Sequence, residues 1–272
     1  MTAQSREQQI EEVYDVLQKI SFRILAIYQN TAPLSIEVKK DRSPVTQADT
    51  ISSRMLLDHF SRDDYSIISE ETGKRTGKNT DNIWIIDPLD GTSDFITKNG
   101  EFCIMVGLVE KGVPILGVIY CPVTHIGYHA HKGHGAYKRS PDGKTKQMFV
   151  SKKNIIHDMN IVSSRSHHLP SDDAVLEKLG VNKSILMGSL GLKVGMIVEQ
   201  KADIYINTSD KTSIWDTAAP EIIVREAGGT MTDIYGRRLV YNDTSSTHNH
   251  HGVVVSNNTI HKQIVDIIQA SL

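Results

Sequence analysis

The sequence predicts a layered protein of helices and sheets, of α+β or α/β class, with αβαβα as the favoured order of layers. Stretches with apolar residues at helical spacing alternate with short apolar stretches rich in valine and isoleucine, in mixed order along the chain. The length of 272 residues is enough to bury a large core, and it fits one large domain or two tightly packed halves.

The first half is expected to begin with an amphipathic helix, because apolar residues from Ile10 to Leu25 recur at helical spacing. The later segments contain short apolar stretches between glycine and proline residues, which is typical of strands. The turn Glu-Lys-Gly-Val-Pro, residues 110–114, indicates a hairpin. Helices are expected over residues 1–28 and 51–60, and strands over 65–70, 83–86, 102–109 and 115–120, with strand-like pieces from 125 to 137.

The polar stretch KRSPDGKTKQ, residues 138–147, is the predicted joint between two halves, residues 1–145 and residues 146–272. The second half is expected to mix strands and helices again. Its last predicted helix opens at Trp215 and is closed by the glycine pair at 228–229. Strands are expected over residues 159–163 and 202–206, and helices over 172–179, 190–199 and 215–226.

Charge and cysteine content exclude several classes of function. Lys and Arg total 30 and Asp and Glu total 32, so the formal net charge is −2. This balance provides no general basic surface for nucleic acid or for a membrane. Cys103 and Cys121 both lie in apolar, strand-like stretches, which indicates reduced, packed thiols of a cytosolic protein rather than a disulfide framework.

The predicted location is the cytoplasm. The first residues, MTAQSREQQIEEV, lack the pattern of a signal peptide. No apolar stretch approaches the ~20 residues that cross a bilayer, so no transmembrane segment is expected. Peripheral association with the inner face of the membrane stays open as an alternative.

The stretch IIDPLDGTSDF, residues 85–95, places two carboxylates three positions apart at the end of a predicted buried strand. Pro88 and Gly91 indicate that the chain turns sharply as it leaves the strand. If Asp87 and Asp90 face the same space, their charges repel each other in a partly desolvated setting unless a cation or a proton compensates them. The pair therefore predicts a site for chemistry.

Further acidic positions adjoin the ends of predicted elements, namely Asp49 in SPVTQAD, Glu70 in ISEETG and Asp216 in IWDTAAPE. Taken singly, Asp49 and Asp216 are more simply explained as helix N-caps and Glu70 as a solvated loop acid. Together with IIDPLDG, they supply the oxygen ligands that Mg²⁺ prefers. If a helix begins at Gly91 and Thr92, its first amides would form a phosphate cradle. The pattern predicts a two-metal phosphatase, with a calcium site or a haloacid-type phosphotransferase as alternatives.

Three longer motifs carry a family resemblance. They are SEETG, WIIDPLDGTSDF and WDTAAPEIIVREAGG, which together with SPVTQAD span Asp49 to Gly229. In order and spacing they resemble the signatures of the lithium-sensitive, magnesium-dependent phosphatases of the inositol monophosphatase superfamily. The resemblance implies the αβαβα fold of inositol monophosphatase and fructose-1,6-bisphosphatase.

Shorter motifs resemble one branch of that superfamily, the 3'(2'),5'-bisphosphate nucleotidases. These motifs are SPVTQAD, DGTSDF followed by NGEF, SSRSHH, GSLGLK and IWDTAAPE. Enzymes of this branch remove a phosphate from 3'-phosphoadenosine 5'-phosphate, the by-product of sulfate transfer. The resemblance therefore implies a phosphomonoesterase that forms AMP, with a small phosphorylated nucleotide as its partner.

Matching positions imply a role for each candidate residue. Asp49 and Thr92 would hold and deprotonate the water that attacks phosphorus. Two or three Mg²⁺ ions, for which Mn²⁺ can substitute, would be held by Glu70, Asp87, the carbonyl of Leu89, Asp90 and Asp216. Substrate contacts would come from Gly91, Thr92, Ser164, Arg165, Ser166, His167, Gly188, Ser189, Lys193 and Asp216. The first half would thus carry most metal ligands, and the second half would carry the last metal ligand and substrate contacts.

The assignment of substrate leaves alternatives open. Arg165 could lie in a solvated surface turn, and Ser189 could cap a helix. Positions 93 and 94 are Ser and Asp, where nucleotidases of this branch often have Lys and Glu. An inositol phosphate or another sugar phosphate is therefore an alternative substrate. A noncatalytic protein that holds Ca²⁺ and senses a nucleotide is disfavoured, because passive binding does not need a water-activating pair. A homodimer is also open.

Overall fold

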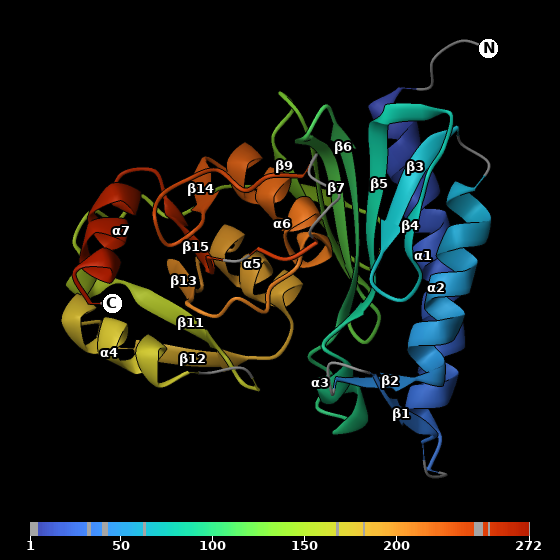
Figure 1. The fold of residues 1–272 in the computed structure, drawn as a ribbon, viewed down its shortest axis with the longest axis horizontal. Coiled ribbons are helices and arrows are strands. Elements are labelled where there is room, and N and C mark those ends of the chain that lie inside the picture. The colour runs from blue at the N-terminus through green and yellow to red at the C-terminus, as the bar shows by residue number, and fades with distance from the viewer. Residues whose placement is uncertain are drawn as a thin grey trace.

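The computed structural model describes residues 5–31, 34–39, 43–61, 64–166, 169–181, 183–241, 247–249 and 251–271. Helices and two large sheets are arranged in five layers (Figure 1). From one side to the other, the layers are α4 (Pro170–Leu179) with α7 (His261–Gln269), a smaller sheet, α5 (Leu190–Val198) with α6 (Ile214–Glu226), a larger sheet, and α1 (Arg6–Gln29) with α2 (Gln47–Phe60). This order confirms the predicted αβαβα architecture.

The larger sheet has eight strands and contains the acidic motif. In spatial order they are β10 (Thr145–Met148), β9 (Ala136–Arg139), β8 (Ile126–His131), β7 (Val113–Cys121), β6 (Cys103–Glu110), β5 (Asn79–Asp90), β3 (Tyr65–Ser69) and β4 (Gly73–Arg75). Neighbours are antiparallel except β3 and β5, which are parallel. The carboxyl ends of β3 and β5 therefore meet, and the amide of Glu70 donates to the carbonyl of Ile86 at 3.3 Å.

The smaller sheet has five strands of mixed direction. In spatial order they are β12 (Lys183–Met187), β11 (Asn160–Ser164), β13 (Ile204–Asn207), β15 (Val253–Asn257) and β14 (Gly229–Thr232). β11 runs parallel to β12 and β13, whereas β15 runs antiparallel to β13 and β14. Shorter elements are the two-stranded sheet of β1 (Ile36–Val38) and β2 (Pro44–Thr46), and the helix α3 (Thr92–Ile96).

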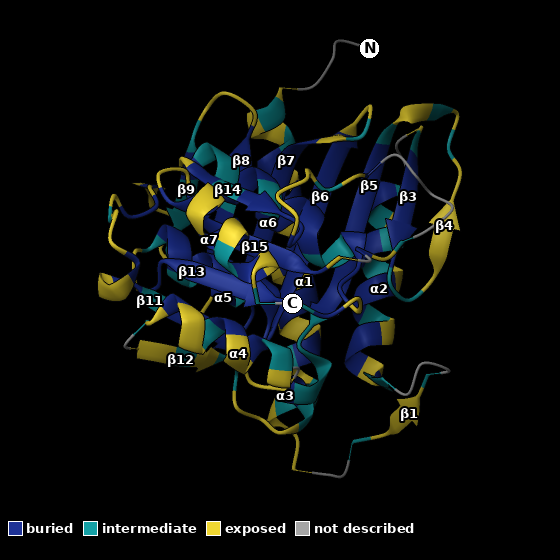
Figure 2. Ribbon diagram, turned by 60° about the vertical axis from the view of Figure 1, so that its left-hand side comes forward, coloured by how far each residue is buried: buried dark blue, intermediate teal, exposed yellow. Residues whose placement is uncertain are grey.

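The first helix follows from its cap and its apolar face. The hydroxyl of Ser5 accepts the amide of Gln8, and the side chain of Gln8 accepts the amide of Ser5. Leu17, Ile20 and Ile24 recur at helical spacing and are fully buried in the core between α1, α2 and the larger sheet. Figure 2 shows that the strands of this sheet are mostly buried, whereas exposed residues gather on loops and on outer helices such as α4.

α6 lies between the two sheets (Figure 1) and packs closely against the larger one. Gly107 on β6 and Gly117 on β7 face this helix. A Cβ atom at Gly117 would lie 2.6 Å from the carbonyl oxygen of Ala219, which is too close for two non-bonded atoms. The lack of side chains at the two glycines therefore lets α6 bring Asp216 close to the larger sheet.

The strand that carries the acidic motif extends further than predicted. β5 does not end at Ile86 but continues through Pro88 to Asp90, with a register shift against β6 between Asp87 and Asp90. Pro88 is tolerated in this bulge because a bulged residue need not donate a hydrogen bond to the neighbouring strand. The hydroxyl of Ser52 on α2 donates to the carbonyl of Pro88 at 2.7 Å. The chain therefore does not turn at Pro88, and the predicted sharp turn comes only at Gly91, which leads from β5 into α3 with a φ of 96°.

The predicted joint at residues 138–147 is a hairpin within the larger sheet. β9 and β10 pair from Ala136 and Met148 to Arg139 and Thr145. The stretch is polar because β10 is an edge strand and most of it is exposed. The chain therefore leaves the larger sheet only after Met148, and a domain division between residues 145 and 146 stays a prediction.

Cys103 and Cys121 are free and buried, which confirms the prediction of packed thiols. Within the described residues, no helix combines the length and the apolar character that crossing a bilayer requires.

Candidate active site

Three carboxylates that lie far apart in the sequence meet where α6 approaches the larger sheet. Asp87 and Asp90 lie at the end of β5, and Asp216 lies in the first turn of α6. One oxygen atom from each carboxylate lies within 4.8 Å of the others. The structure thus brings together three of the predicted metal ligands, which come from both halves of the chain.

The three carboxylates repel one another in a buried setting. Burial, followed by the charges of Glu70, Asp90 and Asp216, raises the pKa of Asp87 well above its usual value. Burial and the charge of Asp90 raise the pKa of Asp216 in the same way. Burial also raises the pKa of Asp90, although the charge of Lys193 opposes this. When deprotonated, the three carboxylates need a cation to compensate their charges. Because they offer oxygen ligands, they suit a hard divalent ion such as Mg²⁺.

The bulge in β5 determines how its polar groups are arranged. The amide of Leu89 donates to Oδ1 of Asp87 at 3.0 Å and so orients that carboxylate. The carbonyl oxygen of Leu89 lies 3.3 Å from Oγ1 of Thr92. Oδ2 of Asp90 accepts the amide of Gly191 at 2.9 Å, so that α5 in the second half also orients the acids. Leu89 therefore offers its carbonyl on the side of the bulge where Thr92 lies.

Glu70 is occupied by a cation of the chain itself. Its Oε1 lies 2.8 Å from Nζ of Lys39, which also contacts Oε1 of Glu71 at 2.5 Å. Lys39 follows β1, and sequence reasoning missed it because no spacing connects it to the acids. The carboxylate of Glu70 is therefore not in the close group of three aspartates, although its charge contributes to the raised pKa of Asp87.

Asp49 and Thr92, the predicted catalytic pair, are hydrogen-bonded to each other. Oγ1 of Thr92 donates to Oδ1 of Asp49 at 2.9 Å. Oδ2 of Asp49 accepts the amide and the hydroxyl of Thr46, at 2.8 and 2.6 Å. Because the hydroxyl of Thr92 uses its hydrogen in the bond to Asp49, its lone pairs are left to accept a hydrogen bond from another group.

Asp49 and Asp216 also stabilise the helices on which they lie. The N-caps of α2 and α6 are Thr46 and Ser213, and the two aspartates occupy the third helical position of a capping box. Oδ2 of Asp216 accepts the amide of Ser213 at 2.7 Å. The interpretation of Asp49 and Asp216 as N-cap residues is therefore wrong, because both lie three positions after the N-cap. Each acid nevertheless accepts a capping hydrogen bond and also lies in the candidate site.

Gly91 and Thr92 begin a helix, as the phosphate cradle requires, but this helix is short. Gly91 has a φ of 96°, a left-handed conformation that favours glycine, and α3 has only 5 residues. A Cβ atom at Gly91 would also lie 3.0 Å from the carbonyl oxygen of Glu101. A helix of this length has little macrodipole, so an anion here would depend on individual backbone amides.

The GSLGLK motif forms the turn into α5. Ser189 is the N-cap, and its hydroxyl accepts the amide of Leu192 at 3.1 Å, which confirms the capping interpretation. The ammonium of Lys193 donates to the carbonyl of Gly188, and the side chain is buried. Burial lowers the pKa of Lys193, while the charge of Asp90 opposes this shift. In this structure the ammonium of Lys193 therefore interacts with the charge of Asp90 and with the carbonyl of Gly188.

Arg165 is held in place by an acid that sequence reasoning did not single out. Its Nη2 and Nε lie 2.8 and 3.1 Å from the two carboxylate oxygens of Glu101. Oε2 of Glu101 also accepts the amide of Gly188 at 2.7 Å. Arg165 is thus exposed but anchored beside the GSLGLK turn, which is not the arrangement of a freely solvated surface turn.

The remaining predicted substrate residues lie close to Arg165 in the chain. Ser164 is buried at the end of β11, and Ser166 is exposed. His167 lies outside the described residues. Glu101 lies in the NGEF motif, so the signal for it was present in the sequence, whereas its contact with Arg165 depends on the packing of the two halves.

The chain is similar to proteins of one family in both sequence and structure. The model of the inositol monophosphatase family matches residues 6–272. The chain is 32% identical over 244 residues to the 3'(2'),5'-bisphosphate nucleotidase CysQ of Escherichia coli (strain K12), covering 87% of this chain and 95% of that protein. The crystal structure of CysQ from Bacteroides thetaiotaomicron is similar with a TM-score of 0.74 and 30% identity, over 92% of this chain and 97% of that chain. The extragenic suppressor protein suhB from Bartonella henselae shares the fold, with a TM-score of 0.83 and 23% identity over 97% of this chain and 99% of that chain.

Proposed function

The chain belongs to the inositol monophosphatase family, and from this premise we propose that it is a Mg²⁺-dependent 3'(2'),5'-bisphosphate nucleotidase. The reaction is the hydrolysis of 3'-phosphoadenosine 5'-phosphate to AMP and phosphate. The name of the Escherichia coli relative and the likeness to the Bacteroides thetaiotaomicron protein support this choice of branch. The by-product of sulfate transfer would then be the substrate.

The observation that carries the proposal is the buried group of Asp87, Asp90 and Asp216 beside the hydrogen-bonded pair of Asp49 and Thr92. The three aspartates, with the carbonyl of Leu89 and with Glu70 once Lys39 releases it, would hold the metal ions. Mg²⁺ ions bound there supply charge that neutralises the transferring phosphoryl group and activates water. The number of ions stays a prediction.

Asp49 and Thr92 are proposed to move one proton. A water that donates to Oγ1 of Thr92 can pass its proton to that oxygen while the hydroxyl proton of Thr92 moves to Oδ1 of Asp49, 2.9 Å away. The water oxygen attacks phosphorus, and the bond between phosphorus and the 3' oxygen breaks. That oxygen leaves as an alkoxide and takes a proton from solvent, which balances the reaction without a covalent intermediate.

Selectivity for a substrate with a second phosphate is assigned to Arg165. Its contacts with Glu101 use Nε and Nη2, so Nη1 is the part of the guanidinium that a ligand would meet. Glu101 orients both Arg165 and the amide of Gly188, and therefore links the two substrate motifs. The predicted contacts of Ser164, Ser166, His167, Ser189 and Lys193 with the substrate stay predictions.

The test is a comparison of kcat/KM for 3'-phosphoadenosine 5'-phosphate and inositol 1-phosphate. We expect the wild type to prefer the bisphosphate. Arg165→Ala should lower kcat/KM for the bisphosphate by roughly tenfold to a hundredfold, because a charge-assisted contact is worth about 1.5–3 kcal/mol, and should barely change the monophosphate. Arg237→Ala is the matched control, since Arg237 forms a comparable pair with Asp233 at 2.7 Å outside the site. A preference for inositol 1-phosphate, or equal losses on both substrates, would assign the protein to the sugar-phosphate branch.

Four finer points stay predictions. Sensitivity to lithium and a place in sulfur metabolism follow from the branch to which the chain is assigned. A cytoplasmic location, with or without contact to a membrane surface, and a homodimer are compatible with the fold.

A further inference from the structure

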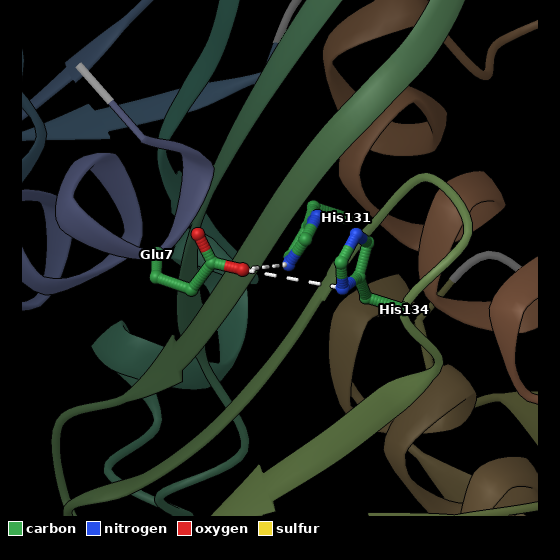
Figure 3. Close-up of side chains that lie close together, drawn as sticks. All are labelled: Glu7, His131 and His134. Atoms are coloured by element: carbon green, nitrogen blue, oxygen red, sulfur yellow. Dashed lines mark ion pairs between the residues drawn. The ribbon is translucent and has the colours of Figure 1, made fainter.

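Figure 3 shows a second group of metal-ligating side chains, the Glu7–His131–His134 cluster. Nε2 of His131 lies 3.1 Å from Oε1 of Glu7, and Nδ1 of His134 lies 4.0 Å from the same oxygen. One ligand atom from each residue lies within 4.8 Å of the others. We propose that this cluster binds a transition-metal ion of the Zn²⁺ class.

The two histidines lie at either end of a hydrogen-bonded turn between β8 and β9. The amide of His134 donates to the carbonyl of His131 at 3.1 Å, which closes the turn between β8 and β9. Glu226, the last residue of α6, accepts the amides of Gly133 and Gly135 with its two oxygens, both at 3.0 Å. Both glycines have positive φ, 83° and 84°, which only glycine adopts easily. The turn is therefore fixed before any ion arrives.

The donor set selects the metal. Two imidazole nitrogens and one carboxylate oxygen are typical zinc ligands, whereas Mg²⁺ and Ca²⁺ take oxygen ligands. Metal bonds of about 2.0–2.1 Å in a tetrahedron place neighbouring ligand atoms about 3.3 Å apart. The two distances to Oε1 of Glu7, 3.1 and 4.0 Å, lie on either side of this spacing, and the exposed side chains of Glu7 and His134 are free to rotate toward an ion. Water would complete the coordination.

The protonation of the cluster suits a metal. Hydrogen bonds at the start of α1, first with its own backbone amide, lower the pKa of Glu7 and keep it ionised. Burial, followed by the charge of His134, lowers the pKa of His131, so that its neutral form has a lone pair to donate. His134 also lies 4.0 Å from Glu7, and its ring stacks on that of His131 with centroids 3.9 Å apart and planes 30° apart, so His134 has to turn out of this stack to direct a lone pair at an ion shared with His131. Two protonated rings at this distance would repel each other.

The cluster is separate from the acidic site. β8 is separated from β5 by β6 and β7 in the larger sheet, which places them three strand spacings, or about 14 Å, apart. The ligands of the Glu7–His131–His134 cluster come from the first turn of α1, from the end of β8 and from the turn between β8 and β9. The ion would therefore tie the start of the chain's first helix to the sheet and would stabilise the fold without taking part in hydrolysis.

The experiment is a calorimetric titration of the full chain with Zn²⁺ in excess Mg²⁺, which occupies the acidic site. Glu7→Gln and His134→Gln are the test variants, because both side chains are more than 60% exposed and folding should survive their change. His125→Asn is the matched control, since it removes an exposed imidazole at the other end of β8 and Asn tolerates its left-handed φ of 54°.

We expect one Zn²⁺ to bind per wild-type and per His125→Asn chain, with the affinity lowered at least about tenfold in both test variants. Added Zn²⁺ should raise Tm in wild type and control and not in the test variants. Co²⁺ in place of Zn²⁺ should give the visible spectrum of a tetrahedral nitrogen and oxygen site only where the cluster is intact. Identical isotherms in all four proteins, which would mean binding at the acidic site, or no binding in the wild type, would overturn the proposal.

Discussion

The two carboxylate oxygens of Asp49 have different partners, one at the start of a helix and one in the candidate active site. Oδ2 accepts hydrogen bonds from Thr46 at the start of α2, and Oδ1 accepts the hydroxyl of Thr92. A substitution of Asp49 would therefore weaken the capping box of α2 and the predicted catalytic pair of Asp49 and Thr92 together. Thr92 is the cleaner position at which to test the pair, because its side chain does not cap α2.

Thr92→Val should lower kcat by about 100-fold or more, because proton transfer by a positioned group contributes at least that much. Thr92→Ser keeps the hydroxyl and should stay within about tenfold of the wild type. Steady-state kinetics on the bisphosphate with saturating Mg²⁺ measure both. A Thr92→Val enzyme that kept the wild-type kcat would remove Thr92 from the proton path.

Asp90→Asn should lower kcat/KM by at least about 100-fold, because it removes one charge from a site that depends on charge. The wild type should itself be active only with Mg²⁺ or Mn²⁺. Circular dichroism should show a folded variant, since an amide oxygen can still accept the amide of Gly191. Asp266→Asn is the matched control, because Asp266 pairs with Lys262 on α7 away from the site. Full activity in excess chelator would contradict the metal role.

α6 is the element on which core and site both depend. Its residues pack against β6 and β7 at Gly107 and Gly117, and its first turn presents Asp216 to β5. A change that pushes α6 away from the sheet should therefore affect stability and activity together.

Gly117→Ala should destabilise the protein by about 1–3 kcal/mol, the usual cost of overpacking, because the new Cβ would meet the backbone of α6. Urea denaturation should show a lower midpoint with an unchanged slope. Gly143→Asn in an exposed turn is the control, since Asn tolerates the positive φ of 81° there. A midpoint equal to that of the wild type would mean that α6 can shift without cost.

The longer elements could be predicted because their apolar residues follow one period. The predicted helices at 51–60, 172–179, 190–199 and 215–226 all occur as α2, α4, α5 and α6, with ends shifted by a few residues. β1, β4 and β12 had no prediction, because short strands with mostly exposed residues carry no apolar alternation. Residues 138–147 indicated a joint for a related reason, since the polar edge hairpin of β9 and β10 has the composition of a linker.

The acids of the candidate site could be predicted from motifs, whereas their partners could not. Lys39 and Glu101 lie 31 and 64 positions from the residues they pair with, Glu70 and Arg165. Only the assembled fold brings such residues together. The Glu7–His131–His134 cluster could not be predicted for the same reason, because Glu7 and the two histidines lie at opposite ends of the first half of the sequence.

Metal ions and protons compete for the acidic site as a whole. The pKa values of Asp87, Asp90 and Asp216 lie above the ordinary 3.8, so the folded state binds more protons than the unfolded state. Without metal, this contribution to stability is full below that value and is lost as pH rises through the raised pKa values. Mg²⁺ bound to the deprotonated acids would add more stability as pH rises.

The rise in Tm on replacing chelator by Mg²⁺ should therefore increase from about pH 5 to about pH 8. His129 and His261, whose pKa values burial lowers to about 4, destabilise the protein below their usual pKa of 6.5 with or without metal. Comparing both conditions at each pH removes their contribution. A metal shift that stayed constant across this range would contradict the raised pKa values.

Lithium should inhibit the enzyme at millimolar concentration, as the family resemblance implies. A small monovalent ion in place of one Mg²⁺ beside Asp90 and Asp216 would neutralise less charge on the leaving oxygen or on the product. Phosphate release at fixed Mg²⁺, with K⁺ at equal ionic strength as the control, measures the effect. Full activity in tens of millimolar Li⁺ would count against close kinship with the lithium-sensitive members.

The position of α6 between the sheets imposes an order on biosynthesis. Asp216 follows Asp90 by 126 positions, so a ribosome that adds 5–20 residues per second takes about 6–25 s between them. Through that interval the nascent larger sheet has no α6 over Gly107 and Gly117, and its acids lack their third partner. A ribosome-bound chain that stops before Ile214 should therefore be unable to retain the metal and should expose an apolar sheet face on which chaperones can act.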